Sequence, residues 1–305
     1  MAETNTAALR AQGRRDARAL SVTGRCRADT GRIRCAAKAL ARMARAVTPE
    51  TPNGQWLRDN RSFACAAAGD AVAALRHARV RTAGGQTALG ACCAGLLRAC
   101  EGALTVKAAE AYLEGFQDVL PLETAELALL VPGLQAAVVC ALADTYTGDG
   151  AAAPALFTSL RALGTAAWGM LAERCDRVGR ILARDPVGVY PAMDEATRAY
   201  YRQTVARLAR RTGRAEIDIA EDVLARARKA AMVRGGTWAG FCCARCWALR
   251  KSAATAGGTS RPSWWGRCFC RYCWASRPKA CRARCCCSSR CRRWSRACST
   301  RCCCA

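Results

Sequence analysis

The residues whose types and spacing are best suited to chemistry are four cysteines near the end of the chain. Cys243 and Cys246 form one Cys-x-x-Cys pair, Cys270 and Cys273 form a second, and 23 residues separate the pairs. This spacing is close to that of a structural zinc site, in which four thiolates surround the metal tetrahedrally. Arg and Trp residues around the pairs would also suit nucleic acid, by charge and by base stacking. A zinc-binding or nucleic-acid-binding module is therefore one interpretation of this segment.

The composition of the same segment argues against a metal module. From Gly236 to Ala305 the chain has fifteen Cys, six Trp and fifteen Lys or Arg, but no Asp, Glu, Asn, Gln, Ile, Val or Met. The triplets Cys285–Cys287 and Cys302–Cys304 suit neither a zinc site nor a disulfide framework, because adjacent thiols cannot all reach partners. A segment without acids and with almost no aliphatic residues cannot build a core. We therefore expect residues 234–305 to be a disordered Cys/Arg/Trp-rich tail.

A change of reading frame explains this composition. Joining the last base of each codon to the first two of the next converts every Cys-Cys pair into Leu. The same shift turns Gly236–Cys243 into His/Asn/Tyr/Asp, Leu/Val/Met, Gly, Trp/Arg/Gly, Phe/Leu/Ile/Val, Leu and Leu. Arg267–Ala275 becomes mostly Leu, and Leu-rich runs are what membrane helices need. We favour a frame change between about Lys229 and Thr237 over a metal module or a secreted disulfide framework.

The first 235 residues offer little that could build an active site. His77 has no Ser, Cys or carboxylate at a diagnostic spacing, so we expect a plain surface or core role. Glu123 and Glu126 are spaced like the paired carboxylates of a di-metal bundle, but no Glu-x-x-His partner exists. Asp59-Asn60 is either a polar site or, as we expect, a source of helix-surface hydrogen bonds. Gly84-Gly85 lacks the Lys and the spacing of a phosphate loop. We expect no catalytic, cofactor-binding or metal-binding residue here.

The remaining cysteines are expected to be small thiols that pack inside the protein. This expectation covers Cys26, Cys35, Cys65, Cys140 and Cys175. For the adjacent pair Cys92-Cys93 on a helix, we expect one thiol in the core and one at its edge.

The charge and hydropathy of the chain limit the cellular compartment and the binding partners that we expect for it. The formal net charge is +25, of which the tail supplies +15 and the first 235 residues +10. The excess Arg before the tail alternates with Ala and Leu, which favours a solvated helix face over a nucleic-acid patch. No run of about 20 apolar residues is present as encoded, and the first residues lack the pattern of a signal peptide. We therefore expect a cytoplasmic protein without a ligand of its own.

Helical periodicity dominates the chain up to about Met232. Ile33, Ala37, Leu40 and Met43 recur at helical spacing, and a second helix is expected from near Gln55. Further helical segments are expected at Ala71–Val80, Ala88–Ala103, Lys107–Phe116, Gly133–Tyr146 and Ala155–Leu182.

The best-defined helix pair comes last. Asp194 is suited to cap a helix that runs to about Arg211, and Gly213 suits a left-handed C-terminal cap. Glu216–Met232 follows, with Ile217, Ala220 and Leu224 expected to face inward. Because period-2 patterns are almost absent, we predict an all-α fold, an antiparallel helical bundle or array over residues 25–233, after a flexible segment at 1–24.

Three stretches resemble the N-terminal region of the cyclic β-1,2-glucan synthetases, which are very large membrane glycosyltransferases. Thr51-Pro-Asn-Gly-Gln-Trp-Leu-Arg-Asp-Asn60 is similar to the family's Pro-x-x-x-Trp-Leu-x-Asp-Asn. Tyr112–Leu127 is similar to its Tyr-Gln-x-x-x-x-Leu-Thr-x-Gly-Glu-Leu-Trp, although Ala128-Leu129 stands where the family has Trp. Asp185–Tyr190 with Met193–Arg202 resembles its Asp-Pro-x-x-x-Tyr and Met-Asp-x-x-Thr-Arg-x-x-Tyr-Arg, the most specific match.

The resemblance covers about residues 25–233 and implies a cytoplasmic all-α region that precedes membrane helices. The family continues with a stretch similar to His-Val-Gly-Tyr-Tyr-Leu-Ile, which the shifted frame of Gly236–Cys243 matches. The family uses UDP-glucose, but its catalytic domains lie further downstream, so the resemblance places no catalytic residue on this chain. We therefore expect a truncated N-terminal region without glucosyltransferase activity. The alternatives are a helical adaptor with a zinc-binding or nucleic-acid-binding tail, and a helical scaffold that binds other proteins.

Overall fold

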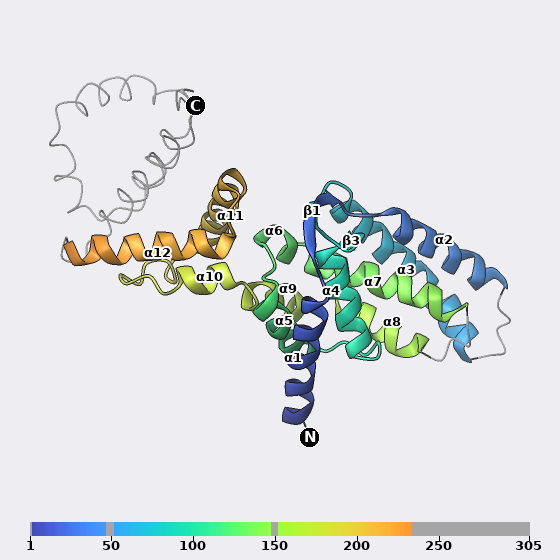
Figure 1. Ribbon diagram of the computed structural model, residues 1–305. Coiled ribbons are helices and arrows are strands. Elements are labelled where there is room, and N and C mark those ends of the chain that lie inside the picture. Colours follow the sequence, from blue (N-terminus) through green and yellow to red (C-terminus); the bar gives the residue numbers. More distant parts are fainter. Residues whose placement is uncertain (1, 47–51, 148–151, 234–305) are drawn as a thin grey trace, which may run out of the picture. The chain divides into compact units, whose positions relative to one another are not determined.

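The computed structural model of the protein describes residues 2–46, 52–147 and 152–233 (Figure 1). The chain divides into two units, residues 1–224 and 225–305. The prediction of an all-α fold is confirmed, with one small sheet in addition. The elements are α1 (Ala2–Arg18), β1 (Val22–Arg27), α2 (Gly31–Ala46), α3 (Pro52–Leu75), β2 (Arg79–Ala83), β3 (Gln86–Thr87), α4 (Ala88–Ala99), α5 (Val106–Val119), α6 (Thr124–Leu127), α7 (Leu130–Thr145), α8 (Ala153–Ala162), α9 (Ala166–Arg174), α10 (Arg177–Leu182), α11 (Glu195–Thr212) and α12 (Glu216–Val233).

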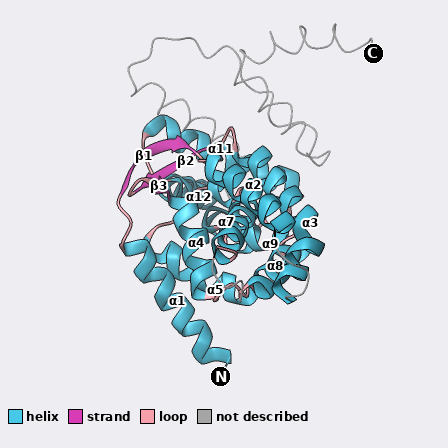
Figure 2. Cartoon of the chain, turned by 90° about the vertical axis from the view of Figure 1, so that its right-hand side faces the viewer, coloured by secondary structure: helices cyan, strands magenta, loops and turns pink. Residues whose placement is uncertain are grey.

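The main core is built around α7. This helix is apolar around most of its circumference, which is the pattern of a helix enclosed by other elements. It contacts α2, α3, α4, α8 and α9, and Figure 2 shows it among them. Leu134, Val138 and Leu142 of α7 are fully buried. Trp56 of α3 stacks on Phe157 of α8 with ring centroids 6.2 Å apart, so aromatic side chains join the outer helices.

The N-terminal segment differs from the expected flexible one. Residues 2–18 form α1, which packs along α5. Two glycines permit the close approach, because a Cβ on Gly13 would lie 2.2 Å from the carbonyl oxygen of Tyr112, and one on Gly115 would lie 1.9 Å from that of Arg10. The hydroxyl of Tyr112 also donates to Asp16 at 2.6 Å. Backbone contact across the helix pair therefore fixes α1, and the sequence pattern of α1 alone gave no sign of its partner.

A second, smaller core joins α10, α11 and the start of α12. Val178, Ile181, Val205, Ile219 and Leu224 are buried together in it. The predicted caps of α11 are confirmed: the Asp194 carboxylate accepts a hydrogen bond from the amide of Thr197 at 2.9 Å, and Gly213 has a φ of 68°. In α12, Ala220 and Leu224 are buried as predicted and Ile219 is buried in addition, whereas Ile217 is only half-buried.

The three-stranded antiparallel sheet was not expected. The helical pattern predicted for Ala71–Val80 stops when α3 ends at Leu75, and β2 pairs with β1 on one side and β3 on the other. Gly84 and Gly85 have φ values of 58° and 82°, which a two-residue hairpin turn requires. Val80 and Ala83 are buried and hold the hairpin against the core. Cross-strand pairing thus overrides a helical pattern that was only a few residues long.

The single helical segment expected over Ala155–Leu182 is three helices, α8, α9 and α10. The second break is made by Asp176, whose carboxylate accepts a hydrogen bond from the amide of Gly179 at 3.0 Å and so starts α10. Pro132 lies in the first turn of α7, where the missing amide hydrogen is tolerated. Among the described residues, no helix combines the length and the apolar character needed to cross a membrane.

Candidate functional site

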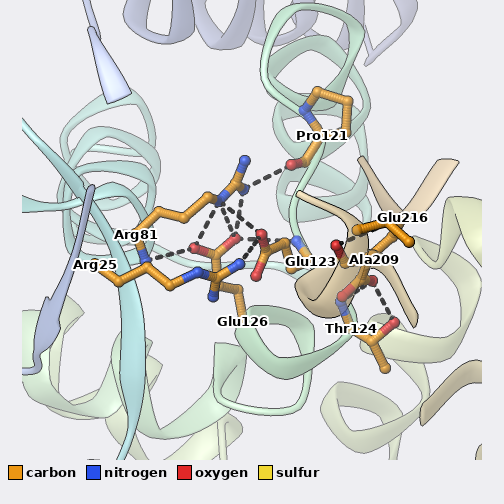
Figure 3. A network of polar contacts seen from close by, with 9 residues as sticks. Arg25, Arg81, Pro121, Glu123, Thr124, Glu126, Ala209 and Glu216 are labelled. Carbon is orange, nitrogen blue, oxygen red and sulfur yellow. Dashed lines mark hydrogen bonds and ion pairs between the residues drawn. The ribbon is translucent and has the colours of Figure 1, made fainter. Parts of the chain in front are cut away.

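The densest polar cluster lies where the sheet meets α6 (Figure 3). Arg25 of β1 and Arg81 of β2 are directly opposite each other in the ladder, so their side chains project from the same face. Glu123 precedes α6 and Glu126 lies within it. The sheet therefore supplies two guanidinium groups and the α6 segment supplies two carboxylates.

The central contact is between Arg81 and Glu126. The Arg81 Nη2 atom lies 2.5 Å from Oε2 of Glu126, and Nε lies 3.0 Å from Oε1. The backbone amide of Arg81 also donates to Oε1 at 3.2 Å, while Nη2 donates to the carbonyl of Pro121 at 2.7 Å. The Glu126 side chain is completely buried and that of Arg81 is 15% exposed. This is a two-point, charge-assisted pair, the strongest form of such contacts.

Glu123 completes the charge balance. Its Oε1 accepts from Arg25 at 2.5 Å and lies 3.7 Å from Nε of Arg81. Its amide donates to Oε2 of Glu126 at 3.0 Å, which closes the turn that starts α6. The Glu123 Oε2 atom is buried and forms no hydrogen bond within the described part of the chain. Two arginines and two glutamates therefore neutralise one another at the edge of the core.

Glu216, at the start of α12, extends the network. Its carboxylate accepts from the amide of Thr124 at 2.8 Å and from the Thr124 hydroxyl at 2.7 Å. Burial raises the pKa of Glu216, the nearby charge of Glu123 adds to the rise, and the bonds from Thr124 oppose it. Burial alone would lower the pKa of Arg81, but hydrogen bonds and charges of the glutamates, Glu126 first, raise it, so Arg81 remains charged.

This arrangement is suited to holding elements together. The oxygens of Glu126 are already engaged by Arg81 and by backbone amides, so a metal ion would have to displace a guanidinium. Among the described residues, no group of three or more His, Cys, Asp or Glu side chains is placed to hold a metal. The carboxylate pair that the sequence suggested for a di-metal bundle therefore pairs with arginines here. Arg25 and Arg81 were missed, because their partners are 98 and 45 residues away along the chain.

The other polar residues singled out from the sequence lie apart from this network. His77 is exposed in the turn between α3 and β2, and Asp59 is exposed on α3. Asn60 is 4% exposed, which is not the helix surface that we expected. Its amide donates to the carbonyl of Trp56 at 2.9 Å, and its oxygen accepts from Arg161 of α8 at 2.5 Å. Asn60 therefore joins α3 to α8.

The cysteines differ in part from the expectation. Cys92 and Cys93 are both buried, because α4 is packed on both sides and neither thiol reaches the edge of the core. Cys175 is buried as expected, but Cys35 is exposed and Cys26, Cys65 and Cys140 are half-buried. Burial raises the pKa of Cys93 to about 12, so this thiol is protonated and unreactive at neutral pH. Cys243, Cys246, Cys270 and Cys273 lie outside the described residues.

Comparisons with known proteins do not add a relative. No family model, no curated protein and no solved structure matches this chain.

Proposed function

We propose that residues 25–233 are the all-α N-terminal region of a cyclic β-1,2-glucan synthetase-like membrane glycosyltransferase. In this proposal the helical region has a structural role. The transfer of glucose from UDP-glucose is carried out by domains that are encoded downstream. The residues from about 234 onward are an out-of-frame translation of the segment that would enter the membrane. The region by itself is proposed to lack glucosyltransferase activity.

The observation that carries this proposal is the geometry of the most specific stretch of resemblance, Asp185–Tyr190. The Asp185 carboxylate accepts hydrogen bonds from the amides of Val187 at 3.2 Å, Val189 at 3.0 Å and Tyr190 at 3.2 Å. Asp185 and Tyr190 are 8% and 4% exposed. Pro186 and Gly188, whose φ is 69°, bend the backbone around this carboxylate. The first and last residues of the Asp-Pro-x-x-x-Tyr pattern are therefore both buried in this loop, and the Asp carboxylate holds its backbone amides.

The other two stretches also supply buried contacts. Leu57 and Asn60 of the first stretch are buried, and Trp56 stacks on Phe157. In the second, Tyr112 and Phe116 are fully buried in the main core, and Glu126 forms the central ion pair of the network. Residues that hold a fold together are the ones expected to be shared with related helical regions. This supports a scaffold role for them and gives none of them a part in chemistry.

The first test is enzymatic. The purified chain should show no turnover of UDP-glucose and form no β-1,2-linked glucan in a radiolabelled sugar assay. The matched sample is the protein expressed from DNA whose downstream frame has been restored, assayed in membranes, which should form glucan. Glucan formation by the chain as it stands would contradict the proposal, and so would an inactive restored protein that is correctly inserted.

The second test distinguishes the proposal from a helical adaptor with a metal-binding tail. The DNA around codons 229–237 should carry a continuous alternative frame that encodes Leu-rich segments. Stoichiometric zinc in the purified chain, lost on Cys246→Ser, would instead support the adaptor. An early stop codon in the alternative frame would overturn the frame change.

A further inference from the structure

The helix α2 carries a row of four cations on its exposed face. Arg34, Lys38, Arg42 and Arg45 are all exposed, at spacings of four, four and three residues. At about 100° per residue they fall within an arc of about 80° and extend over about 16 Å along the axis. We call these four residues the α2 row.

The α2 row faces directly away from the core. Ile33, Leu40 and Ala44 are buried on the opposite side of the helix. On one flank, the Cys65 thiol of α3 donates to the carbonyl of Ala37 at 3.8 Å. On the other flank, α2 packs against α7. The neighbouring helices therefore border the buried side of α2 and leave the row open.

The charges of the α2 row are not compensated within the described part of the chain. Helix α2 contains no Asp or Glu, and none of the four cations forms an ion pair with a described residue. Exposed arginines elsewhere do form such pairs: Arg10 lies 2.9 Å from Glu114, and Arg14 lies 2.8 Å from Asp118. Like charges four residues apart destabilise a helix. An external polyanion would remove this repulsion.

We propose that the α2 row docks the protein onto the surface of an anionic lipid bilayer. Helices with four to eight Lys or Arg on one face are attracted to anionic lipids, by roughly 1 kcal/mol, or fivefold, for each cation near the surface. Because the apolar side of α2 is in the core, the contact is electrostatic and needs no insertion. This inference rests on α2 alone and does not depend on the proposed function.

The residues beside the row favour a bilayer over nucleic acid. Gly31, Cys35, Ala41 and Ala46 are the other residues on or next to this face, and all are small. Helix α2 has no aromatic ring on which a base could stack and no Asn or Gln to pair with adenine. Small neighbours also let a straight row of cations approach a flat surface closely.

A local measurement on α2 tests the proposal in the full chain. A photoreactive benzoylphenylalanine introduced in place of the exposed Cys35, next to the row, should form cross-links to lipid in phosphatidylcholine vesicles that contain phosphatidylserine. Cross-linking should fall at least about fivefold with vesicles of phosphatidylcholine alone and in about 1 M salt, where the Debye length is about 3 Å. The probe reports on the surroundings of α2, and variants of the row separate its charges from those of the basic residues after 233.

Two matched variants identify the charges that matter. The combined substitution Arg34→Gln, Lys38→Gln, Arg42→Gln and Arg45→Gln should reduce cross-linking at least about tenfold. A control with the same change of net charge, Arg76→Gln, Arg79→Gln, Arg180→Gln and Arg184→Gln, should leave it nearly unchanged; these four arginines are exposed and lie outside α2. Equal loss in both variants, no lipid cross-link in the unchanged α2, or stronger cross-linking to a DNA or RNA duplex than to lipid would overturn the proposal. Circular dichroism of both variants checks that they remain folded.

Discussion

At the scale of single residues, we expect the stability of the fold to be most sensitive to substitution of Glu126, because its carboxylate is fully buried and paired with one arginine. We predict that Glu126→Ala lowers the free energy of unfolding by about 3 kcal/mol, since the largely buried Arg81 charge then loses its two-point partner and keeps only the more distant Glu123, 3.7 Å from its Nε. Glu126→Gln should cost less, because its amide oxygen can still accept from one of the two backbone amides that donate to the carboxylate. Urea denaturation followed by tryptophan fluorescence measures both.

The control for Glu126 is an exposed ion pair. Arg174 and Glu110 lie 3.9 Å apart, and their side chains are 46% and 35% exposed. Arg174→Ala should change stability little, because exposed pairs contribute about 0–1 kcal/mol. A loss for Glu126→Ala no larger than that of the control would show that the network does not stabilise the fold.

Glu216 gives the fold a pH dependence that can be isolated. Its folded-state pKa is raised by burial and by Glu123, with Thr124 and Arg210 acting in the opposite direction, so the folded protein binds this proton more tightly than the unfolded chain. The stability contributed by the proton is fully present below the unfolded pKa of about 4.3 and is lost as the pH rises through the raised pKa. We predict that Glu216→Gln, which carries no charge, removes this loss and is therefore more stable than the natural chain at pH 7.

The measurement is the difference in unfolding free energy between Glu216→Gln and the natural chain from pH 4.5 to pH 7.5. The difference should grow with pH, because all other titrating groups are shared. Glu216→Ala serves as the comparison: it deletes the acceptor for two bonds from Thr124 and should be less stable than Glu216→Gln by about 2 kcal/mol at either pH, because neither variant titrates at this position. A difference that stays flat over this range would contradict the buried, high-pKa state of Glu216.

At the scale of elements, the contact of α1 with α5 depends on glycine. We predict that Gly115→Ala destabilises the protein by about 3 kcal/mol, because the new methyl group would overlap the backbone oxygen of Arg10, and backbone cannot move aside as a side chain can. Gly69→Ala in α3 is the matched control. Nothing lies within 4 Å of its Cβ position, so it should stabilise the protein by about 0.5–1 kcal/mol through better helix propensity. Thermal unfolding of the two variants should shift in opposite directions, and a shift in the same direction would mean that α1 is not closely packed.

The elements that could be predicted from the sequence are those whose ends are fixed by local chemistry. Asp194 and Gly213 mark the two ends of α11 because a side-chain cap and a left-handed residue act within a few residues of the helix. The β1–β2 ladder could not be found in this way, since Val22–Arg27 pairs with residues more than fifty positions away. The β2–β3 turn did carry a signal, the Gly84-Gly85 pair with Thr82 and Thr87 two positions away on either side.

The polar network is where local reasoning fails most clearly. The spacing of Glu123 and Glu126 suggested a carboxylate pair, but its chemistry depends on Arg25 and Arg81, which only the sheet brings together. Because the sheet was not predicted from the sequence, the positions of its two arginines could not be predicted either. The same limit applied to α1, whose close contact with α5 depends on two glycines about a hundred residues apart.

At the scale of the whole molecule, the chain combines a helical region of ordinary composition with a segment that has the composition of shifted leucine codons. If the frame changes between about codons 229 and 237, cells that carry the gene should contain peptides from residues 52–228 joined to products of the alternative frame. Mass spectrometry of membrane and soluble fractions tests this. The expected result is Leu-rich peptides and none of the Arg- and Cys-rich peptides from residues 236–305.

Detection of the Cys-rich peptides at the same abundance as those of the helical region would contradict the frame change. The thiols would then have to be assigned a partner, and zinc at Cys243, Cys246, Cys270 and Cys273 would be the first to examine. The mass-spectrometry result also bears on the role of the helical region. It decides whether the helix pair α11 and α12 is followed in the natural protein by a membrane segment or by a second folded module.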